Sequence, residues 1–215
     1  MLNINRGALA YETVGDNHSA DTGRSNVKKE IMKPIVLDNI FSEKELFYIY
    51  KTLVSAPSWT VDTTSQKVMT DSNKNYAGGA MFIVREENRT IHNHVFNVYG
   101  QTLVFRIAKL LEEKKIGMHT NLERMWFLSS PTGSPLHFPH QDKQEFNYQS
   151  ILLFITPVWQ TGWRGSFYVQ GEEFKFKPGS AIIFDSQEFH TGEDFISETY
   201  NWQRITCNII VGPNK

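Results

Sequence analysis

The second half of this chain alternates short apolar segments with turn residues, and this pattern limits the fold more than any other feature of the sequence. Proline, glycine, serine and asparagine separate the apolar segments, as they do between short strands. The candidate strands cover residues 123–129, 135–142, 149–157, 166–170, 172–177, 180–184, 189–191 and 203–211. So many short strands in succession predict a mainly β domain.

Two helical patterns precede these strands. A capping box at residues 42–45, followed by apolar residues at helical intervals, predicts a helix over about 43–55. A longer apolar stripe predicts a second helix over residues 90–115. Helices ahead of many short strands suit a double-stranded β-helix, the jelly-roll barrel that cupins also use, with the helices buttressing the barrel.

Composition favours a single domain behind a polar N-terminal segment. A chain of 215 residues, 40% of them hydrophobic, can bury a large core. Residues 1–30 are polar and rich in turn formers, which predicts a long loop or a mobile arm. We therefore expect one domain over residues 31–215.

Charge, cysteine content and hydropathy exclude several classes of partner and compartment. The 22 basic and 23 acidic residues give a net charge of −1, so no overall field favours nucleic acid or an anionic membrane. The single cysteine, Cys207, excludes an internal disulfide and fits the reducing cytoplasm. No apolar run has the length of a membrane span or of a secretory signal. We expect a cytoplasmic protein without nucleic-acid or membrane partners, and of undetermined oligomeric state.

A His-x-Asp pair is the first candidate for chemistry. Alternate side chains of a strand point to one face, so His140 and Asp142 can present a nitrogen and a carboxylate oxygen to one metal ion. A jelly-roll barrel can bring His190 to the same mouth. Two histidines and one carboxylate form the facial triad of non-haem Fe(II) oxygenases, which leaves adjacent coordination positions open. His137 has no carboxylate two residues on, so a pocket wall or a structural role fits it better.

Arg204 is the candidate anchor for an organic co-substrate. An Fe(II) ion with one carboxylate ligand suits a bidentate 2-oxo acid together with O2. The far carboxylate of 2-oxoglutarate would then need a cation inside the barrel. Arg204 can bind a carboxylate through two parallel hydrogen bonds, and Thr206, on the same strand face, can add a hydroxyl donor. An ion pair of Arg204 with Glu188 or Glu193 is the alternative.

These motifs stand in the order found in a known enzyme family. The chain resembles the Fe(II)/2-oxoglutarate-dependent dioxygenase superfamily, nearest to its small prolyl-hydroxylase-like members, in three motifs: His140-x-Asp142, His190 and Arg204-x-Thr206. The resemblance runs from about residue 33 to residue 211 and includes the turn and strand at 177–184 that lead to the distal histidine. One departure is Arg164, which stands before Gly165 where the family commonly has a glycine.

The resemblance implies an activity and its cofactors. The family hydroxylates an amino-acid, peptidyl or other small-molecule C–H bond with Fe(II), 2-oxoglutarate and O2, releases succinate and CO2, and has ascorbate as a candidate stimulant. Asp142 favours hydroxylation, because halogenating relatives carry a small residue there. Nucleic-acid demethylases of the superfamily carry a second arginine where this chain has Ile210. Tyr148 is a candidate hydrogen-bond donor to co-substrate or substrate, with a buried structural role as the alternative.

Substrate selection and the competing function class remain open. Two polar segments, residues 60–79 and 143–148, can cover the mouth of the barrel, although residues 60–79 also suit an ordinary surface loop. A non-catalytic, cupin-like metal- or ligand-binding protein could share the barrel. The Arg204-x-Thr206 motif argues against it, because such a barrel has no need for an arginine beside the metal.

Overall fold

A computed structural model describes the protein over residues 32–56, 60–61, 79–85, 90–91, 94–130, 132, 139–196 and 202–213. All its helices and strands lie within the unit from Ile31 to Lys215. The predicted arm at residues 1–30 lies outside the described residues.

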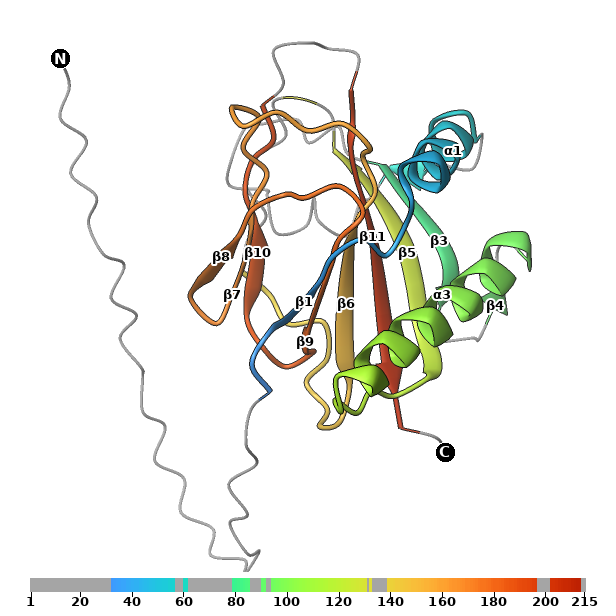
Figure 1. The fold of residues 1–215 in the computed structure, drawn as a ribbon, viewed down its shortest axis with the longest axis vertical. Coiled ribbons are helices and arrows are strands. Elements are labelled where there is room, and N and C mark those ends of the chain that lie inside the picture. Colours follow the sequence, from blue (N-terminus) through green and yellow to red (C-terminus); the bar gives the residue numbers. More distant parts are fainter. Residues whose placement is uncertain are drawn as a thin grey trace, which may run out of the picture. The chain divides into compact units, whose positions relative to one another are not determined.

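Antiparallel strands form a large sheet that carries most of the core (Figure 1). The sheet has eight strands in the order β1-β9-β6-β11-β5-β3-β2, with β4 paired to β3. Their bounds are Ile35–Leu37 (β1), Thr60–Val61 (β2), Gly79–Arg85 (β3), Thr90–Ile91 (β4), Asn121–Ser130 (β5), Gln149–Phe154 (β6), Ala181–Asp185 (β9) and Arg204–Gly212 (β11).

A smaller sheet packs on one face of the large sheet. Its three antiparallel strands lie in the order β10 (His190–Gly192), β7 (Phe167–Val169) and β8 (Glu172–Phe174). A buried apolar cluster joins the two sheets, and its members are Leu152, Phe154, Phe167, Val169, Phe176, Ile182 and Phe184. The two sheets therefore form a β-sandwich, and neither closes on itself within the described residues.

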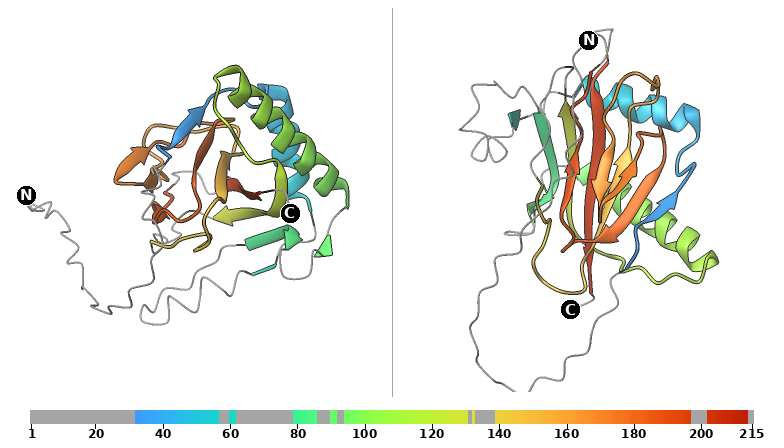
Figure 2. Two further views of the ribbon diagram at one scale, coloured as in Figure 1. Left: turned by 90° about the horizontal axis from the view of Figure 1, so that it is seen from below. Right: turned by 90° about the vertical axis from the view of Figure 1, so that its left-hand side faces the viewer.

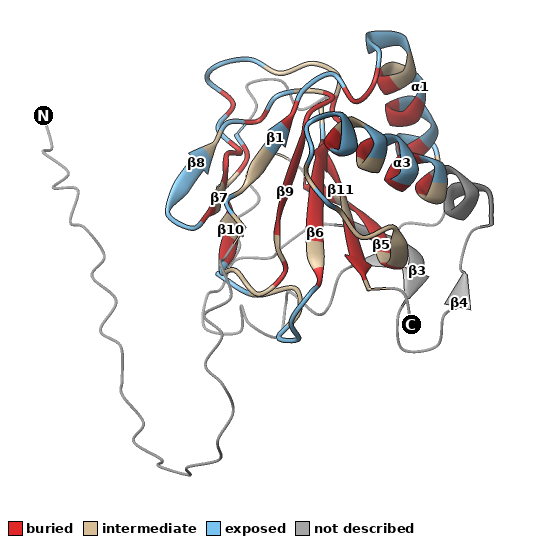
Figure 3. Ribbon diagram, turned by 60° about the horizontal axis from the view of Figure 1, so that its bottom comes forward, coloured by how far each residue is buried: buried red, intermediate tan, exposed pale blue. Residues whose placement is uncertain are grey.

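Two helices cover the opposite face of the large sheet (Figure 2). Helix α1 (Glu43–Val54) begins at Ser42, whose side chain forms the predicted capping box with Glu45. Helix α3 is longer and spans His94–Glu113. In Figure 3 the helices are buried on the side that faces the sheet, and the central strands β6, β9 and β11 are buried along most of their length. Neither described helix combines the length and the apolar character needed to cross a membrane.

The sequence correctly predicted a mainly β protein with flanking helices, but it placed the start of the second helix wrongly. Thr90 and Ile91, which were expected to begin that helix, instead form β4 and pair with Arg85 and Val84 of β3. Both residues are β-branched, so pairing with an available strand overrides a weak helical pattern. The helix begins at His94.

The predicted strand over residues 135–142 is also wrong in its described part. Residues 133–138 lie outside the described residues, and His140 forms only an isolated antiparallel bridge with His190. Pro139 has no backbone N–H to contribute to a strand ladder. After the bridge, Asp142 N and Lys143 N both donate to the Ser186 carbonyl, each at 3.1 Å, and this shared acceptor ends any regular pairing.

The only cysteine of the chain is fully buried between the helices and the large sheet. Burial raises the pKa of the Cys207 thiol, so the thiolate, which is the reactive form, is scarce at neutral pH. We expect iodoacetamide to label the native protein at least about tenfold more slowly than the denaturant-unfolded protein. Mass spectrometry measures both rates, and rapid labelling of the native state would contradict the burial of Cys207.

Candidate metal centre

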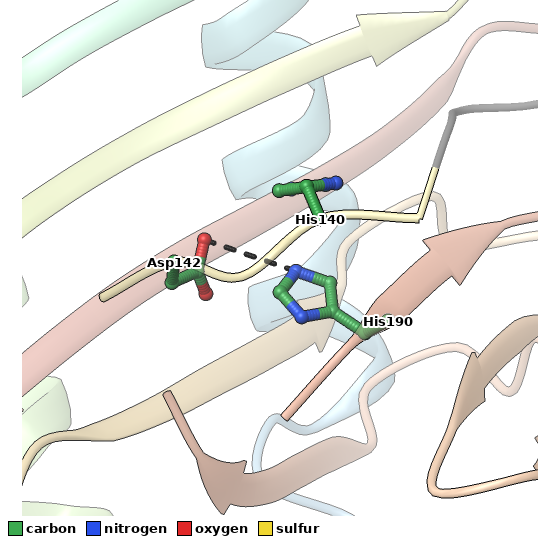
Figure 4. Close-up of side chains that lie close together, drawn as sticks. All are labelled: His140, Asp142 and His190. Atoms are coloured by element: carbon green, nitrogen blue, oxygen red, sulfur yellow. Dashed lines mark ion pairs between the residues drawn. The ribbon is translucent and has the colours of Figure 1, made fainter. Parts of the chain in front are cut away.

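The structure brings together the three predicted metal ligands (Figure 4). One ligand atom each from His140, Asp142 and His190 lies within 4.8 Å of the others. Asp142 and His190 face each other, with Asp142 Oδ1 3.8 Å from His190 Nε2, and His140 lies alongside. Within the described part of the chain, no other three His, Cys, Asp or Glu residues converge in this way.

Backbone hydrogen bonds fix the two histidines relative to each other. His140 N donates to the His190 carbonyl and His190 N donates to the His140 carbonyl, both at 3.0 Å. The two ring centroids lie 4.3 Å apart. Strand β10 then pairs with β7, His190 opposite Val169, so the small sheet anchors this side of the site.

Two serines that the sequence did not single out hold the carboxylate. Ser150 Oγ donates to Asp142 Oδ2 at 2.6 Å, and Ser186 Oγ lies 2.8 Å from Ser150 Oγ. Both serines are buried. Because Oδ2 is engaged by Ser150, Oδ1 is the oxygen that faces His190. A serine inside an apolar strand pattern was the only available signal for Ser150, and it pointed to no function.

The protonation state of His190 suits a metal ligand. Burial lowers the pKa of His190; the Asp142 carboxylate opposes this and the neighbouring His140 adds to it, so the pKa lies below its ordinary value. His190 Nδ1 lies 3.0 Å from the Glu188 carbonyl, and as the donor in that bond it leaves the Nε2 lone pair toward Asp142. A neutral imidazole in this orientation is the form that binds metals.

The donor set and its spacing fit a transition-metal ion. Nitrogen and oxygen ligands bind such ions at about 2.0–2.2 Å, so adjacent ligand atoms lie about 3 Å apart in a filled site. The separations here are 3.8 Å between Asp142 and His190 and at most 4.8 Å within the triad, so they are larger by about 1–2 Å, a change that side-chain rotation can supply. Two histidines and one carboxylate leave several positions open on the ion.

The predicted anchor residues lie on the same face of the large sheet as the triad. Arg204 and Thr206 are 5% and 3% exposed, respectively, and alternate along β11 with the core residues that contact the helices. In register across β6 and β11, Thr206 lies opposite Phe154 and Ile210 lies opposite Ser150. The triad therefore lies near the Ile210 end of this face, and Arg204 lies farther along it.

Glu188 and Glu193 are the alternative partners of Arg204 from the sequence, and the structure pairs Glu193 with Arg164. Glu193 accepts from Arg164 Nε at 3.1 Å and from the Ser166 backbone N–H at 3.0 Å. The Arg204 guanidinium carbon lies 5.9 Å from the centre of the Phe176 ring.

Tyr148 lies away from Arg204. It is 8% exposed and packs with Trp126 and Ile210. It also lies so close to Gly212 that a β-carbon there would be 2.8 Å from its Cδ1 atom. Gly212 and Arg204 are at opposite ends of β11, so the structure does not bring Tyr148 and Arg204 together.

Arg164, which departs from the family pattern, keeps a backbone conformation that favours glycine. Its φ of 57° is left-handed, and Gly165 follows at 82°. Ion pairs to Glu193 (3.1 Å) and Asp194 (2.7 Å) hold the arginine in place. Position 165 must be a glycine, because a β-carbon there would lie 2.8 Å from Trp159 Cζ2 and 3.4 Å from Arg204 Cδ. The Arg164 turn thus fixes the backbone beside Arg204.

His137 lies outside the described residues. Residues 62–78, which make up most of the candidate cover at 60–79, lie outside them too. The second candidate cover, residues 143–148, is irregular and is tied to the segment before His190 by a 2.6 Å bond from Gln187 Nε2 to the Gln144 carbonyl.

No protein-family model and no curated protein match this sequence. Solved structures do match. An oxidoreductase of the 2OG-Fe(II) oxygenase family from Burkholderia pseudomallei has a TM-score of 0.59 and 14% identity, over 84% of this chain and 86% of its own. A Trichoplax adhaerens prolyl hydroxylase, solved with a hypoxia inducible factor peptide, has a TM-score of 0.56 and 12% identity over 83% of each chain.

A third similar structure is HygX from Streptomyces hygroscopicus, solved with nickel, 2-oxoglutarate and hygromycin B. It has a TM-score of 0.51 and 13% identity, over 84% of this chain and 83% of its own. These similarities show that the chain has the fold of 2-oxoglutarate/Fe(II) oxygenases.

Replacing Ser150 with alanine tests the support of the carboxylate. The variant loses the hydrogen bond to Asp142 Oδ2, so we expect divalent-metal affinity to fall roughly 10- to 100-fold. Isothermal titration with Fe(II) or Ni(II) under anaerobic conditions measures it. Ser129→Ala is the matched control, because Ser129 is a buried strand serine that bonds Gln203 instead. Equal metal affinity in both variants would remove Ser150 from the site.

The Arg164 turn predicts a pH-dependent contribution to stability. Burial raises the pKa of Glu193, but hydrogen bonds from Ser166 and Arg164 and the charge of Arg164 outweigh it, so the folded pKa lies below the ordinary 4.5. The resulting stabilisation is complete above pH 4.5 and is lost as the pH falls through the folded pKa.

Arg164→Gly keeps the left-handed backbone and removes the ion pairs. We expect it to lower the free energy of unfolding at pH 7 by less than about 1 kcal/mol, because the Arg164 side chain is 49% exposed. Denaturation curves should show the difference from the parent shrinking at acidic pH. In a Glu193→Gln background the difference should change less with pH, because only the ion pair of Arg164 with Asp194 remains. An equal change with pH in both backgrounds would contradict the assignment to Glu193.

Proposed function

We propose that this chain is an Fe(II)- and 2-oxoglutarate-dependent dioxygenase that hydroxylates an amino-acid, peptidyl or other small-molecule C–H bond. The observation that carries the proposal is the convergence of His140, Asp142 and His190 on the sheet face that also bears buried Arg204. This donor set is the one that non-haem Fe(II) oxygenases use. The similar fold of solved oxygenases supports it.

We also propose a jelly-roll architecture and the domain bounds. The two packed sheets are the halves of a double-stranded β-helix, the jelly-roll barrel, and α1 and α3 buttress it. The domain covers residues 31–215, and residues 1–30 form a polar arm. The face-to-face packing through the Phe154 and Phe167 cluster supports this assignment.

Each site residue has a role in the proposed reaction. His140, Asp142 and His190 hold Fe(II). Arg204 binds the far carboxylate of 2-oxoglutarate, since a buried guanidinium matches a carboxylate in shape and charge, and Thr206 adds a hydroxyl donor. The iron and the co-substrate together supply the oxidising chemistry and yield succinate and CO2. Tyr148 lies beside Lys143, close to Asp142, so a substrate contact suits it better than a co-substrate contact.

The similar structures indicate the range of substrates to test. HygX is solved with hygromycin B, a small molecule, and the Trichoplax adhaerens enzyme with a peptide. O2 is the second co-substrate, ascorbate is a candidate stimulant, and the cytoplasm is the proposed compartment. A non-catalytic cupin-like protein is the weaker alternative, because it gives no reason for Arg204 and Thr206 to be buried on the face that bears the triad.

The decisive experiment measures 2-oxoglutarate consumption. Anaerobic binding of Fe(II) and 2-oxoglutarate, followed by O2 and an assay for succinate over a panel of metabolites and peptides, should show O2-dependent turnover. His190→Ala should abolish it, because only two ligands remain. His119→Ala, which removes a half-buried histidine outside the triad, should retain it. Turnover by His190→Ala at the parent rate would falsify the metal assignment.

Arg204→Lys tests the co-substrate anchor. The substitution keeps the positive charge and loses the planar fork, so the KM for 2-oxoglutarate should rise roughly 10- to 100-fold, or about 1.5–3 kcal/mol. Arg106→Lys is the control, since Arg106 forms a half-exposed ion pair with Glu45. An unchanged KM in Arg204→Lys would move the carboxylate site elsewhere.

A further inference from the structure

Asn208 is the least buried residue of strand β11. Every other residue of this strand is buried, whereas Asn208 is partly exposed. The strand lies between β6 and β5 in the large sheet (Figure 1). Asn208 shares a face with Arg204 and Thr206, because alternate residues of a strand point to one side. Its exposure shows that this part of the face is open, so a bound ligand can reach the Asn208 side chain.

Asn208 and Thr206 are neighbouring polar residues on a largely apolar face. The residues directly opposite them on β5 and β6 are apolar or aromatic, namely Trp126, Leu128, Leu152 and Phe154. None of these side chains offers a hydrogen-bond acceptor, since an indole only donates. Polar groups in apolar surroundings are unfavourable unless they are hydrogen-bonded. The bonds of Asn208 and Thr206 must therefore come from each other or from a ligand.

The Thr206 hydroxyl accepts a hydrogen bond and has a proton left to give. Asn208 Nδ2 lies 3.4 Å from Thr206 Oγ1, a long hydrogen bond in which the amide donates. Thr206 is 3% exposed, and no residue in the described part of the chain accepts from its hydroxyl. A buried donor without an acceptor is unfavourable. An acceptor on a bound ligand would satisfy it.

The direction of the Asn208 bond determines what Thr206 can bind. An amide N–H only donates, so it occupies a lone pair of the hydroxyl and directs the hydroxyl proton away from Asn208. Hydrogen bonds in a chain polarise one another, so a hydroxyl that accepts one bond donates more strongly in the next. Its best acceptor is a charged oxygen, because charge-assisted hydrogen bonds are about twice as strong as neutral ones. Thr206 is therefore oriented to donate to a carboxylate.

We propose that Asn208 is a positioning residue for the co-substrate: it holds the Thr206 hydroxyl as a donor to the far carboxylate of 2-oxoglutarate. This role rests on the proposed function, in which 2-oxoglutarate binds the metal at one end and Arg204 at the other. Asn208 lies between the two ends, because Ile210, two residues on, is opposite Ser150, which supports the metal carboxylate. Loss of Asn208 weakens the far-carboxylate contact and leaves the metal end unchanged.

Titration calorimetry of 2-oxoglutarate and of pyruvate into the Ni(II)-loaded protein tests this role without turnover. Pyruvate is a 2-oxo acid without the far carboxylate, so it reports the metal end alone. Asn208→Leu, which has a similar shape and cannot donate, should weaken 2-oxoglutarate binding roughly 3- to 10-fold. It should leave pyruvate binding within about twofold of the wild-type value, because pyruvate does not reach Thr206.

Asn121→Leu is the matched control. Asn121 is a partly buried asparagine of β5, and its amide bonds the Glu123 carboxylate at 2.6 Å and the Pro213 carbonyl at 3.3 Å. It lies opposite Gly212, at the end of β11 farthest from Arg204. We expect Asn121→Leu to change neither affinity.

A Thr206→Val background separates positioning from a merely structural effect. The valine keeps the shape and removes the hydroxyl, so Asn208→Leu has nothing left to orient and should weaken 2-oxoglutarate further by less than about twofold. Equal losses from Asn208→Leu in both backgrounds, or an equal loss of pyruvate binding, would overturn the proposal. Should Asn208→Leu not fold, Asn208→Ala takes its place in the same comparison.

The same titrations distinguish a failure of this role from a failure of the proposed function. A wild-type protein that does not bind 2-oxoglutarate rejects the proposed function, and the role of Asn208 with it. A wild-type protein that binds 2-oxoglutarate, with no weakening in Asn208→Leu, rejects the role of Asn208 alone.

Discussion

The reciprocal pair of backbone hydrogen bonds between His140 and His190 is the contact on which the candidate site depends. His140 lies in the segment that leads to β6 of the large sheet, and His190 begins β10 of the small sheet. One bridge therefore ties the two sheets together where the ligands converge. Main-chain bonds fix the Cα positions of both histidines at about 5.5 Å, so the imidazole pair is set by the fold and not by side-chain packing alone.

Strand β11 shows how the fold positions the rest of the site. Ile205, Cys207 and Ile209 pack into the core beneath the helices, and Arg204 and Thr206 alternate with them on the opposite face. A shift of one residue in register would move Arg204 into that core, which makes the register strongly specified. The same hydrophobic burial that stabilises the sheet thus determines where the guanidinium lies.

Much of the fold and the triad could be predicted from the sequence, because apolar periodicity and strand spacing are local signals. The capping box of α1 and most strands of the second half follow from them. The Ser150 to Asp142 bond and the left-handed turn at Arg164 could not be predicted. Arg164 depends on Glu193, 29 residues away, and Thr90 becomes a strand only because β3 lies beside it. Each of these features is decided by a partner that the local sequence does not contain.

The hydrogen bond from Ser150 also bears on how many positions the proposed iron site keeps open. A carboxylate can bind a metal through one oxygen or through two, and a bidentate aspartate would occupy one more position. Here Oδ2 accepts the Ser150 hydroxyl at 2.6 Å, and Ser186 Oγ lies 2.8 Å from Ser150 Oγ, so Oδ1 would be the ligand atom of the proposed site. A monodentate Asp142 with two histidines would leave three adjacent positions on a six-coordinate ion, the number that a bidentate 2-oxo acid and O2 would together require. Two buried serines thereby connect the packing of β6 against β9 with the coordination number that the proposed reaction needs.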